Sequence, residues 1–155
     1  MAVYFRLYQS ISHGQMRLLL DTNIVMYLIN DTADLNSEVE KMLSDFENQL
    51  FVSAPTLREL VANCHKYSYM QRRWKGPDAL IDSLREDYFI NVLYPQREHY
   101  KTFVNLTWNE AEDHRDTTDL LIIAHAITEH LTLISSDRKF PFYRNQGLQL
   151  IYNKK

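Results

Sequence analysis

The sequence of 155 residues lacks the features of a secreted or membrane protein. Its single cysteine, Cys64, cannot form an internal disulfide. No apolar run approaches the ~20 residues needed to cross a bilayer, and residues 1–15 contain no apolar stretch of signal-peptide length. We therefore expect a protein of the reducing cytoplasm that makes no contact with a membrane.

Glycine and proline are also scarce, and several common site motifs are missing. The three glycines and four prolines are scattered, so no linker, repeat or low-complexity tract divides the chain. The sequence has no G-x-S-x-G turn, no cysteine and histidine spacing typical of zinc sites, and no glycine-rich phosphate loop. These absences argue against a serine hydrolase, a zinc module and a P-loop nucleotide-binding protein.

The composition that remains is that of one ordinary globular domain. Hydrophobic residues make up 45% of the chain and charged residues 24%, and a chain of this length can bury a core without disulfides or metal. We expect one domain from residue 16 to residue 155. Residues 1–15, MAVYFRLYQSISHGQ, show no clear period. They are either a loosely attached extension or the product of a start codon placed too early.

The overall charge excludes a strongly basic nucleic-acid binder. The formal net charge is −3 and the pI is about 6.0, so any grip on nucleic acid must be local. One stretch between Glu59 and Asp78 has no acidic residue. It is either a surface that pairs with phosphates and stacks on unpaired bases, or a solvated helix face with packed aromatics. This basic segment contains His65, Lys66, Arg72, Arg73 and Lys75, interleaved with Tyr67, Tyr69 and Trp74.

Short apolar runs predict five buried strands, and helical patterns fill the intervals between them. The strands are expected at residues 17–20, 50–53, 89–94, 131–135 and 148–152. Because strands alternate with helices, we predict an α/β domain with a central parallel sheet of about five strands and helices on both faces. Apolar residues recur at helical spacing in four groups: Val39, Met42, Leu43 and Phe46; Leu57, Leu60, Val61 and Cys64; Tyr100, Phe103 and Val104; Leu120, Ile123, Ala124 and Ile127.

Two helix starts can be read directly from the sequence. Gly76 and Pro77 place proline where a first helical turn tolerates its missing N–H. In the stretch Asp116-Thr117-Thr118-Asp119, an N-cap oxygen precedes an acidic residue that favours the helix dipole. We therefore expect helices that begin near residue 77 and near residue 117.

Four acidic residues fall near the expected carboxyl ends of strands, where ligands bind in open parallel sheets. Asp21 follows RLLL, and Asp137 follows LTLISS. Glu59 lies early in the helix after LFVSA, and Asp119 lies in the first turn of the helix before LTLIS. Carboxylates from four distant points of the chain are thus expected to meet at one edge of the sheet.

Each of these carboxylates also has a simpler explanation. Asp21 and Asp119 can serve helix N-termini, Glu59 can be a solvated helix residue, and Asp137 can begin a turn. Taken together they favour a metal site, because clustered carboxylates repel one another until a divalent cation compensates them. Oxygen ligands of this kind suit Mg²⁺ or Mn²⁺.

The local sequence around the four carboxylates resembles the PIN domain family. LLLDTNIVMYLI is similar to its first motif, TLRELVANC to the second, HRDTTDLLIIAHA to the third and LTLISSD to the fourth. The third motif resembles that of bacterial VapC-type toxins, many of which have proline where this chain has Thr117. The order and spacing cover nearly the whole chain from Met16, whereas residues 62–95 match least well.

This resemblance implies a PIN-like fold and a metal-dependent ribonuclease that cuts RNA with activated water. It assigns metal ligation, direct or through water, to Asp21, Glu59, Asp119 and Asp137, with Asn23 and Ser135 as supporting groups. It further implies Mg²⁺ or Mn²⁺, an RNA substrate, a small antitoxin and a homodimer.

Three other polar residues near these motifs have less certain roles. Asp116 either caps its helix, which we favour, or assists with metal or substrate. His114 either contacts phosphate or is structural, and His125 is expected to be packed in an apolar helix.

Two other functions would leave different marks in the sequence. A phosphotransfer receiver or aspartyl-phosphate hydrolase with Asp21 as nucleophile would need a second early acidic residue and a lysine at the end of a late strand. The sequence has Thr22 and Asn23 after Asp21, and no lysine ends an expected strand. A catalytically silent PIN-like module that binds RNA or protein would be signalled by lost acidic residues, and all four are present.

Overall fold

A computed structural model of the chain describes residues 15–154. The predicted N-terminal extension therefore lies, except for Gln15, outside the described residues. The strands are β1 (Arg17–Leu20), β2 (Gln49–Ser53), β3 (Ile90–Leu93), β4 (Thr132–Ser135) and β5 (Gln149–Tyr152). The α-helices are α2 (Thr22–Asn30), α3 (Ser37–Ser44), α4 (Ala54–Lys66), α5 (Ser68–Arg73), α6 (Pro77–Glu86), α7 (Arg97–Asn105) and α8 (Thr117–Glu129). Short 3₁₀ turns are η1 (Thr32–Asp34), η2 (Glu110–Glu112) and η3 (Phe140–Gln146).

The five strands form one sheet in the order β3-β2-β1-β4-β5, and every neighbouring pair is parallel. β1 is central: Leu18 pairs with Leu50 of β2 on one side and with Thr132 of β4 on the other. The chain therefore runs outward from β1 in one direction and later returns to build the other half. Such a reversal leaves a crevice at the carboxyl ends of the central strands, where ligands of open α/β sheets bind.

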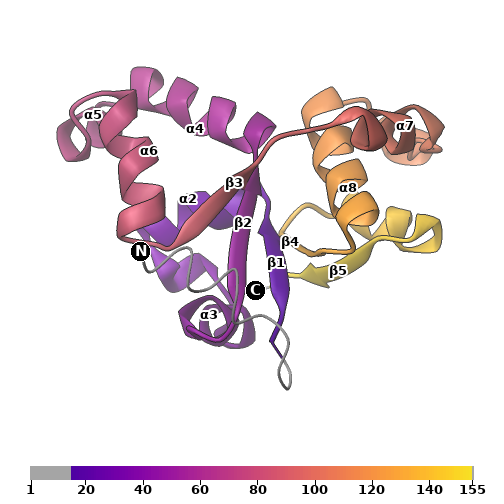
Figure 1. Cartoon of the computed structure of the whole chain (residues 1–155), viewed down its shortest axis with the longest axis horizontal. Coiled ribbons are helices and arrows are strands. Elements are labelled where there is room, and N and C mark those ends of the chain that lie inside the picture. Colours follow the sequence, from indigo (N-terminus) through magenta and orange to yellow (C-terminus); the bar gives the residue numbers. More distant parts are fainter. Residues whose placement is uncertain (1–14, 155) are drawn as a thin grey trace.

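Helices cover both faces of the sheet, as predicted (Figure 1). One core joins Leu18 and Leu20 of β1 to apolar residues of α2, α3, α4, α5 and α6. The other joins Leu19 of β1 to α8 and η3, with Phe103 of α7 packed against it. Successive residues of β1 face opposite sides, so this short strand is wholly buried except at Arg17.

The predicted strands are confirmed to within one residue at each end. The expectation that all five are buried is wrong for β3 and β5, whose residues are mostly half-buried or, at Gln149, exposed. They are the two edges of the sheet, and an edge strand has a neighbour on one side only. Helices begin at Pro77 and Thr117, as expected.

Three apolar residues that fit a helical period do not face the core. α3 ends at Ser44, so Phe46 lies beyond it, 69% exposed and edge-on to Phe89. In α7, Tyr100 and Val104 are 51% and 73% exposed. The helical spacing was correct for α7, but the period alone does not show which face is buried. We find no helix in the described part of the chain that is long and apolar enough to cross a membrane.

Candidate metal centre

Asp21 lies at the carboxyl end of the central strand and is fixed from two sides. It follows β1, is 4% exposed and is the N-cap of α2. Its Oδ1 accepts a hydrogen bond from the Thr22 N–H (2.8 Å), and its Oδ2 accepts one from the Ser135 hydroxyl (2.7 Å). The capping role and the site role proposed for Asp21 are therefore compatible.

Ser135, the last residue of β4, connects two of the carboxylates. Its Oγ donates to Asp21 and accepts a hydrogen bond from the Asp137 N–H (3.0 Å). The Asp137 Oδ1 in turn accepts from the Lys139 N–H (2.9 Å), which forms a turn after the strand. Asn23 reaches the same loop, because its Oδ1 accepts from the Ser136 N–H at 3.4 Å. Ser135 thus contacts Asp21 and Asp137 directly, whereas Asn23 contacts the backbone between Ser135 and Asp137.

Glu59 approaches from α4, in the second turn of the helix. Its Oε1 accepts a hydrogen bond from the Thr22 hydroxyl (3.2 Å). The oxygen of the same Thr22 hydroxyl lies 3.2 Å from the Thr56 hydroxyl. Thr22 therefore links the carboxylate of α4 to the end of β1. Thr22 was not among the residues predicted for the site, although its position directly after Asp21 was the available signal.

Asp119 lies in the first turn of α8 and is held by a histidine. Its Oδ2 lies 3.0 Å from His114 Nε2. Asp116 caps the same helix, because its Oδ1 accepts from the N–H groups of Thr118 and Asp119 at 2.9 and 3.2 Å. The capping role that we favoured for Asp116 is confirmed.

The carboxylates are close enough to raise one another's pKa. Burial, followed by the negative charges of Asp119 and Glu59, raises the pKa of Asp21 to about 7. Burial, followed by Asp116, Asp137 and Glu59, raises the pKa of Asp119 to about 7. Burial and the charge of Asp116 also raise the pKa of Glu59. Each member of the predicted set of four thus interacts electrostatically with at least one other.

This donor set fits a hard divalent cation. One ligand atom each of His114, Asp119 and Asp137 lies within 4.8 Å of the others. The carboxylates of Asp21 and Glu59 interact electrostatically with Asp119 from β1 and α4. Carboxylate oxygens without thiolates are the ligands that Mg²⁺ and Mn²⁺ prefer. A cation bound here would offset the repulsion that raises these pKa values.

Comparisons with known proteins agree with the fold. The family model described as PIN domain matches residues 18–146. The chain belongs to the PIN domain family. No curated protein sequence matches it.

Solved structures of toxin–antitoxin proteins resemble this PIN domain. A chain of VapBC-1 from nontypeable Haemophilus influenzae is 26% identical, with a TM-score of 0.68, 90% of this chain covered and 100% of that one. A chain of VapBC2 from Rickettsia felis, solved with a DNA fragment from its promoter, is 22% identical with the same TM-score and coverage. A chain of FitAcB from Neisseria gonorrhoeae is 17% identical, with a TM-score of 0.64 and coverage of 88% and 97%. The resemblance to VapC-type proteins inferred from the sequence is therefore confirmed.

Two other residues near the site were not identified from the sequence. Lys139 is half-buried, and its positive charge lowers the pKa of Asp119, against the larger effects that raise it. Tyr143 is fully buried, and its hydroxyl lies 3.0 Å from His114 Nδ1. No sequence pattern points to Tyr143, because η3 alone brings it beneath the loop before α8.

A second group of close metal-type ligands in this PIN domain consists of His99, His125 and Glu129. His125 is buried, as predicted, with its Nδ1 2.9 Å from the Ser53 hydroxyl. The Gln96 N–H donates to His99 Nδ1 (2.6 Å), so the proton of neutral His99 is on Nε2, 2.7 Å from Glu129 Oε1. A protonated Nε2 has no lone pair for a cation, so this group joins α7 to α8 and is not a metal site.

The basic segment lies away from the carboxylates. From Glu59 to Lys66, α4 advances by roughly 10 Å, and α5 follows at the far end of that helix (Figure 1). Trp74 is only 5% exposed, so its suggested role as a stacking face for bases is wrong. Tyr67 and Tyr69 are exposed and stack on each other, with ring centroids 5.6 Å apart.

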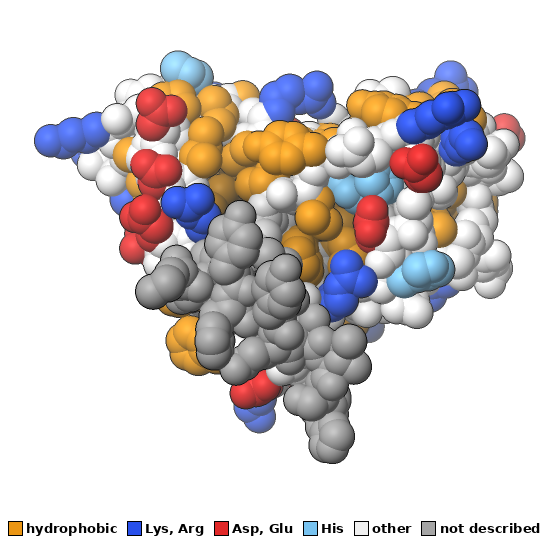
Figure 2. All heavy atoms as spheres, in the orientation of Figure 1, with side chains coloured by type: hydrophobic (Ala, Val, Ile, Leu, Met, Phe, Trp, Pro, Cys, Tyr) orange, Lys and Arg blue, Asp and Glu red, His pale blue; other side chains and the backbone are white. Residues whose placement is uncertain are grey.

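The cations of the basic segment differ in their surroundings. Arg73 donates hydrogen bonds to the Ile29 carbonyl and the Tyr88 hydroxyl, and its guanidinium lies 4.4 Å from the Trp74 ring centroid. Arg72 and Lys75 are exposed. On the face shown in Figure 2, Lys and Arg side chains occur in several separate places among Asp and Glu. A continuous basic surface does not cover this face.

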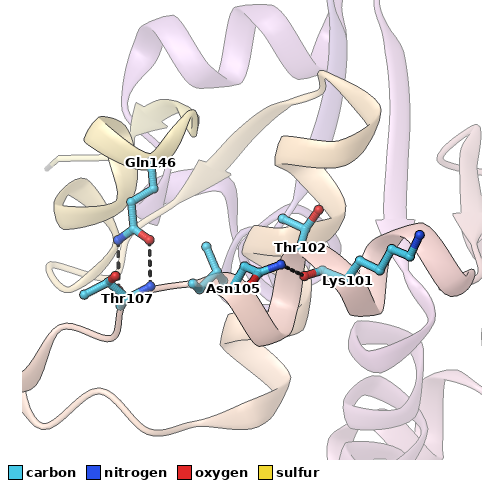
Figure 3. A pocket seen from close by; sticks show the side chains of 6 residues that line it. Lys101, Thr102, Asn105, Thr107 and Gln146 are labelled. Carbon is cyan, nitrogen blue, oxygen red and sulfur yellow. Dashed lines mark hydrogen bonds between the residues drawn. The ribbon is translucent and has the colours of Figure 1, made fainter.

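A cavity of about 500 Å³ lies between the end of α7 and η3. Thr102, Asn105, Thr107 and Gln146 surround it (Figure 3), and Gln146 makes two hydrogen bonds of 2.8 Å with the backbone of Thr107. None of the residues that line it is acidic or a histidine. Its lining is neutral apart from Lys101 and offers no carboxylate or imidazole to bind a metal.

Proposed function

We propose that this PIN domain is a metal-dependent endoribonuclease of the VapC type and the toxin of a toxin–antitoxin pair. The observation that carries the proposal is the electrostatic coupling of Asp21, Glu59, Asp119 and Asp137 at the carboxyl edge of the sheet, with two pKa values raised to about 7. Burial and mutual repulsion of these carboxylates disfavour their ionised forms, and a bound divalent cation would offset this cost.

In this proposal the four carboxylates hold Mg²⁺ or Mn²⁺, and Ser135, Thr22 and Asn23 keep them in place. When bound, the cation supplies Lewis-acid chemistry that activates water and neutralises the charge of the phosphodiester. Hydrolysis then leaves a 5′-phosphate, and no side chain acts as a covalent nucleophile. The positive charge of Lys139, which acts on Asp119, would attract a phosphate that approaches the site.

The partners follow from the same family relationship. Several of the similar structures are VapBC proteins or a toxin–antitoxin complex. Those from Salmonella typhimurium and Rickettsia felis both have DNA bound. This supports a small antitoxin as the partner of the present chain, and we infer a homodimer as its assembly. Because the proposed substrate is RNA, we infer that the activity takes place in the cytoplasm.

The second candidate function, a silent module that binds RNA or protein, is less well supported because all four acidic residues are present and coupled.

A cleavage assay separates the two functions. We expect purified protein to cut single-stranded or structured RNA with Mg²⁺ or Mn²⁺ and to stop when EDTA is added. RNA that is bound but never cut with either metal supports the silent module. Cleavage that survives complete chelation contradicts the metal proposal.

The basic segment gives a separate prediction about RNA binding. If Arg72 and Lys75 contact phosphates, changing both to alanine should raise KM, leave kcat nearly unchanged and reduce the salt dependence of binding by roughly one to two units of log–log slope. Arg73 is left intact because its contacts with Ile29 and Tyr88 support the fold. Arg85→Ala, an exposed cation of α6, is the matched control. An unchanged slope would show that the segment does not bind RNA.

A further inference from the structure

His114 lies beneath the site and is completely enclosed. Its side chain is 0% exposed, and its ring stacks on Phe140 with centroids 5.7 Å apart. The residue before it, Asp113, has a φ of 50°, a left-handed turn that aspartate tolerates. The His114 N–H donates to the Asn109 carbonyl at 3.0 Å. Backbone and ring are therefore fixed on the floor of the loop before α8.

The hydrogen bonds around His114 form one directed chain. The Asn109 N–H donates to the Tyr143 oxygen (3.1 Å), which is 3.0 Å from His114 Nδ1. On the other side of the ring, Nε2 lies 3.0 Å from Asp119 Oδ2. When Asp119 is ionised, as it must be to bind a cation, its carboxylate only accepts, so Nε2 carries the proton and Nδ1 of the neutral ring accepts from the Tyr143 hydroxyl. Each oxygen and nitrogen in this chain has a partner of the correct type.

We propose that His114 is a positioning residue: held by Tyr143 in the Nε2–H tautomer, it fixes Asp119 Oδ2 and leaves Oδ1 as the single oxygen for a divalent cation. Among the described residues, no hydrogen bond reaches Asp119 Oδ1. This inference rests on the proposed function and adds to it a residue outside the four carboxylates.

Two other roles for His114 are less consistent with the geometry. Although its Nε2 lies near Asp119 and Asp137, a protonated nitrogen has no lone pair with which to bind a metal. Packing alone would require neither the Tyr143 hydroxyl nor a contact with Asp119. Groups that orient a ligating side chain in this way typically change metal affinity or activity about 10- to 100-fold when removed.

The test compares three variants by Mn²⁺ affinity, measured by calorimetry, and by RNA cleavage. His114→Leu removes the donor to Asp119 and should weaken Mn²⁺ binding about 10- to 100-fold. His114→Gln keeps an N–H near the Nε2 position and should recover most of that affinity. Tyr143→Phe keeps the packing but removes the hydroxyl, and should weaken Mn²⁺ binding to an intermediate degree.

Nitrogen-15 NMR of the metal-free protein above pH 8, where Asp119 is ionised, checks the tautomer independently of activity. We expect the His114 signals of wild type to report protonated Nε2 and unprotonated Nδ1, and those of Tyr143→Phe to report a mixture. Thermal melting shows that each variant is folded at the temperature of measurement.

The outcomes separate this inference from the proposed function. Wild type that binds Mn²⁺ and cuts RNA, with a His114→Leu variant that is folded and equally competent, would overturn the role of His114 alone. Equal loss in His114→Leu and His114→Gln would make the imidazole itself a ligand and also overturn it. Wild type that binds no Mn²⁺ and cuts no RNA would overturn both.

Discussion

Asp119→Asn and Asp21→Asn should each cut RNA at least about 100-fold more slowly than wild type at fixed Mg²⁺ or Mn²⁺. Asparagine keeps the size of the side chain and an oxygen that can accept from His114 or from Ser135. What is lost is the negative charge, which attracts a divalent cation most strongly in a buried site. The effect should therefore fall on kcat and on metal affinity more than on the binding of RNA.

The measurement is the initial rate of RNA cleavage as a function of metal concentration. Asp82→Asn, an exposed acid on α6, is the matched control and should cleave like wild type. Higher Mn²⁺ should restore part of the activity of the two site variants if they fail through weak metal binding. Near-normal turnover of both variants at low metal would show that the catalytic site lies elsewhere.

The second large effect concerns stability without metal. The pKa of Asp119 is raised from 3.8 to about 7, and that of Asp21 also to about 7. Between these values the folded protein binds more protons than the unfolded chain, so the free energy of unfolding falls as pH rises and levels off above about 7. The contribution of these two groups alone should therefore make the metal-free protein melt at a lower temperature at pH 8 than at pH 5.

The buried histidines act in the opposite direction at lower pH. Burial lowers the pKa of His125 from 6.5 to about 4 and also lowers that of His114. Below pH 6.5 the unfolded chain therefore binds more protons at His125, so this contribution to stability is lost as pH falls toward 4. The difference between wild type and Asp119→Asn removes the contribution of His125, because His125 is present in both proteins.

We expect metal-free Asp119→Asn to melt at a higher temperature than metal-free wild type at pH 8, by a margin that shrinks toward pH 5. Relief of repulsion must exceed the ~0.3–1 kcal/mol that the charge contributes at the helix N-terminus. Cation at about a hundred times its dissociation constant should stabilise wild type by ~2.7 kcal/mol, or roughly 5–10 °C for this size of domain. The variant should gain little.

Differential scanning calorimetry of both proteins, with EDTA and with Mn²⁺ at fixed ionic strength, decides this. If wild type is the more stable without metal and both proteins respond equally to Mn²⁺, Asp119 serves the helix terminus and no four-carboxylate metal site exists.

The elements that the sequence predicts best are those with strong local signals. Asp21 and Asp137 follow short apolar runs, so their place at the end of a parallel sheet could be inferred without coordinates. Helix starts at Pro77 and Thr117 could be read because capping chemistry depends on neighbouring residues only.

What the sequence could not predict depends on packing between distant segments. Trp74 is buried in the core that contains residues of α2 to α6, whereas Tyr100 is exposed. Both outcomes depend on how the helices pack against the sheet and one another. The contact between Tyr143 and His114 joins η3 to the loop before α8 across 29 positions, and neither segment has a hydrophobic period. Lys139 approaches Asp119 only because the turn after β4 folds back toward α8.

The central place of β1 also has a consequence for translation. Asp21 is made early, but the hydroxyl that holds it belongs to Ser135, 114 positions later. A nascent chain that ends before α8 contains β1, β2 and β3 with Asp21 and Glu59, and lacks the other two carboxylates. Contacts this distant in sequence form late. Under the proposed function, a polypeptide that terminates before α8 has only half of the site, and nuclease activity begins only when synthesis is nearly complete.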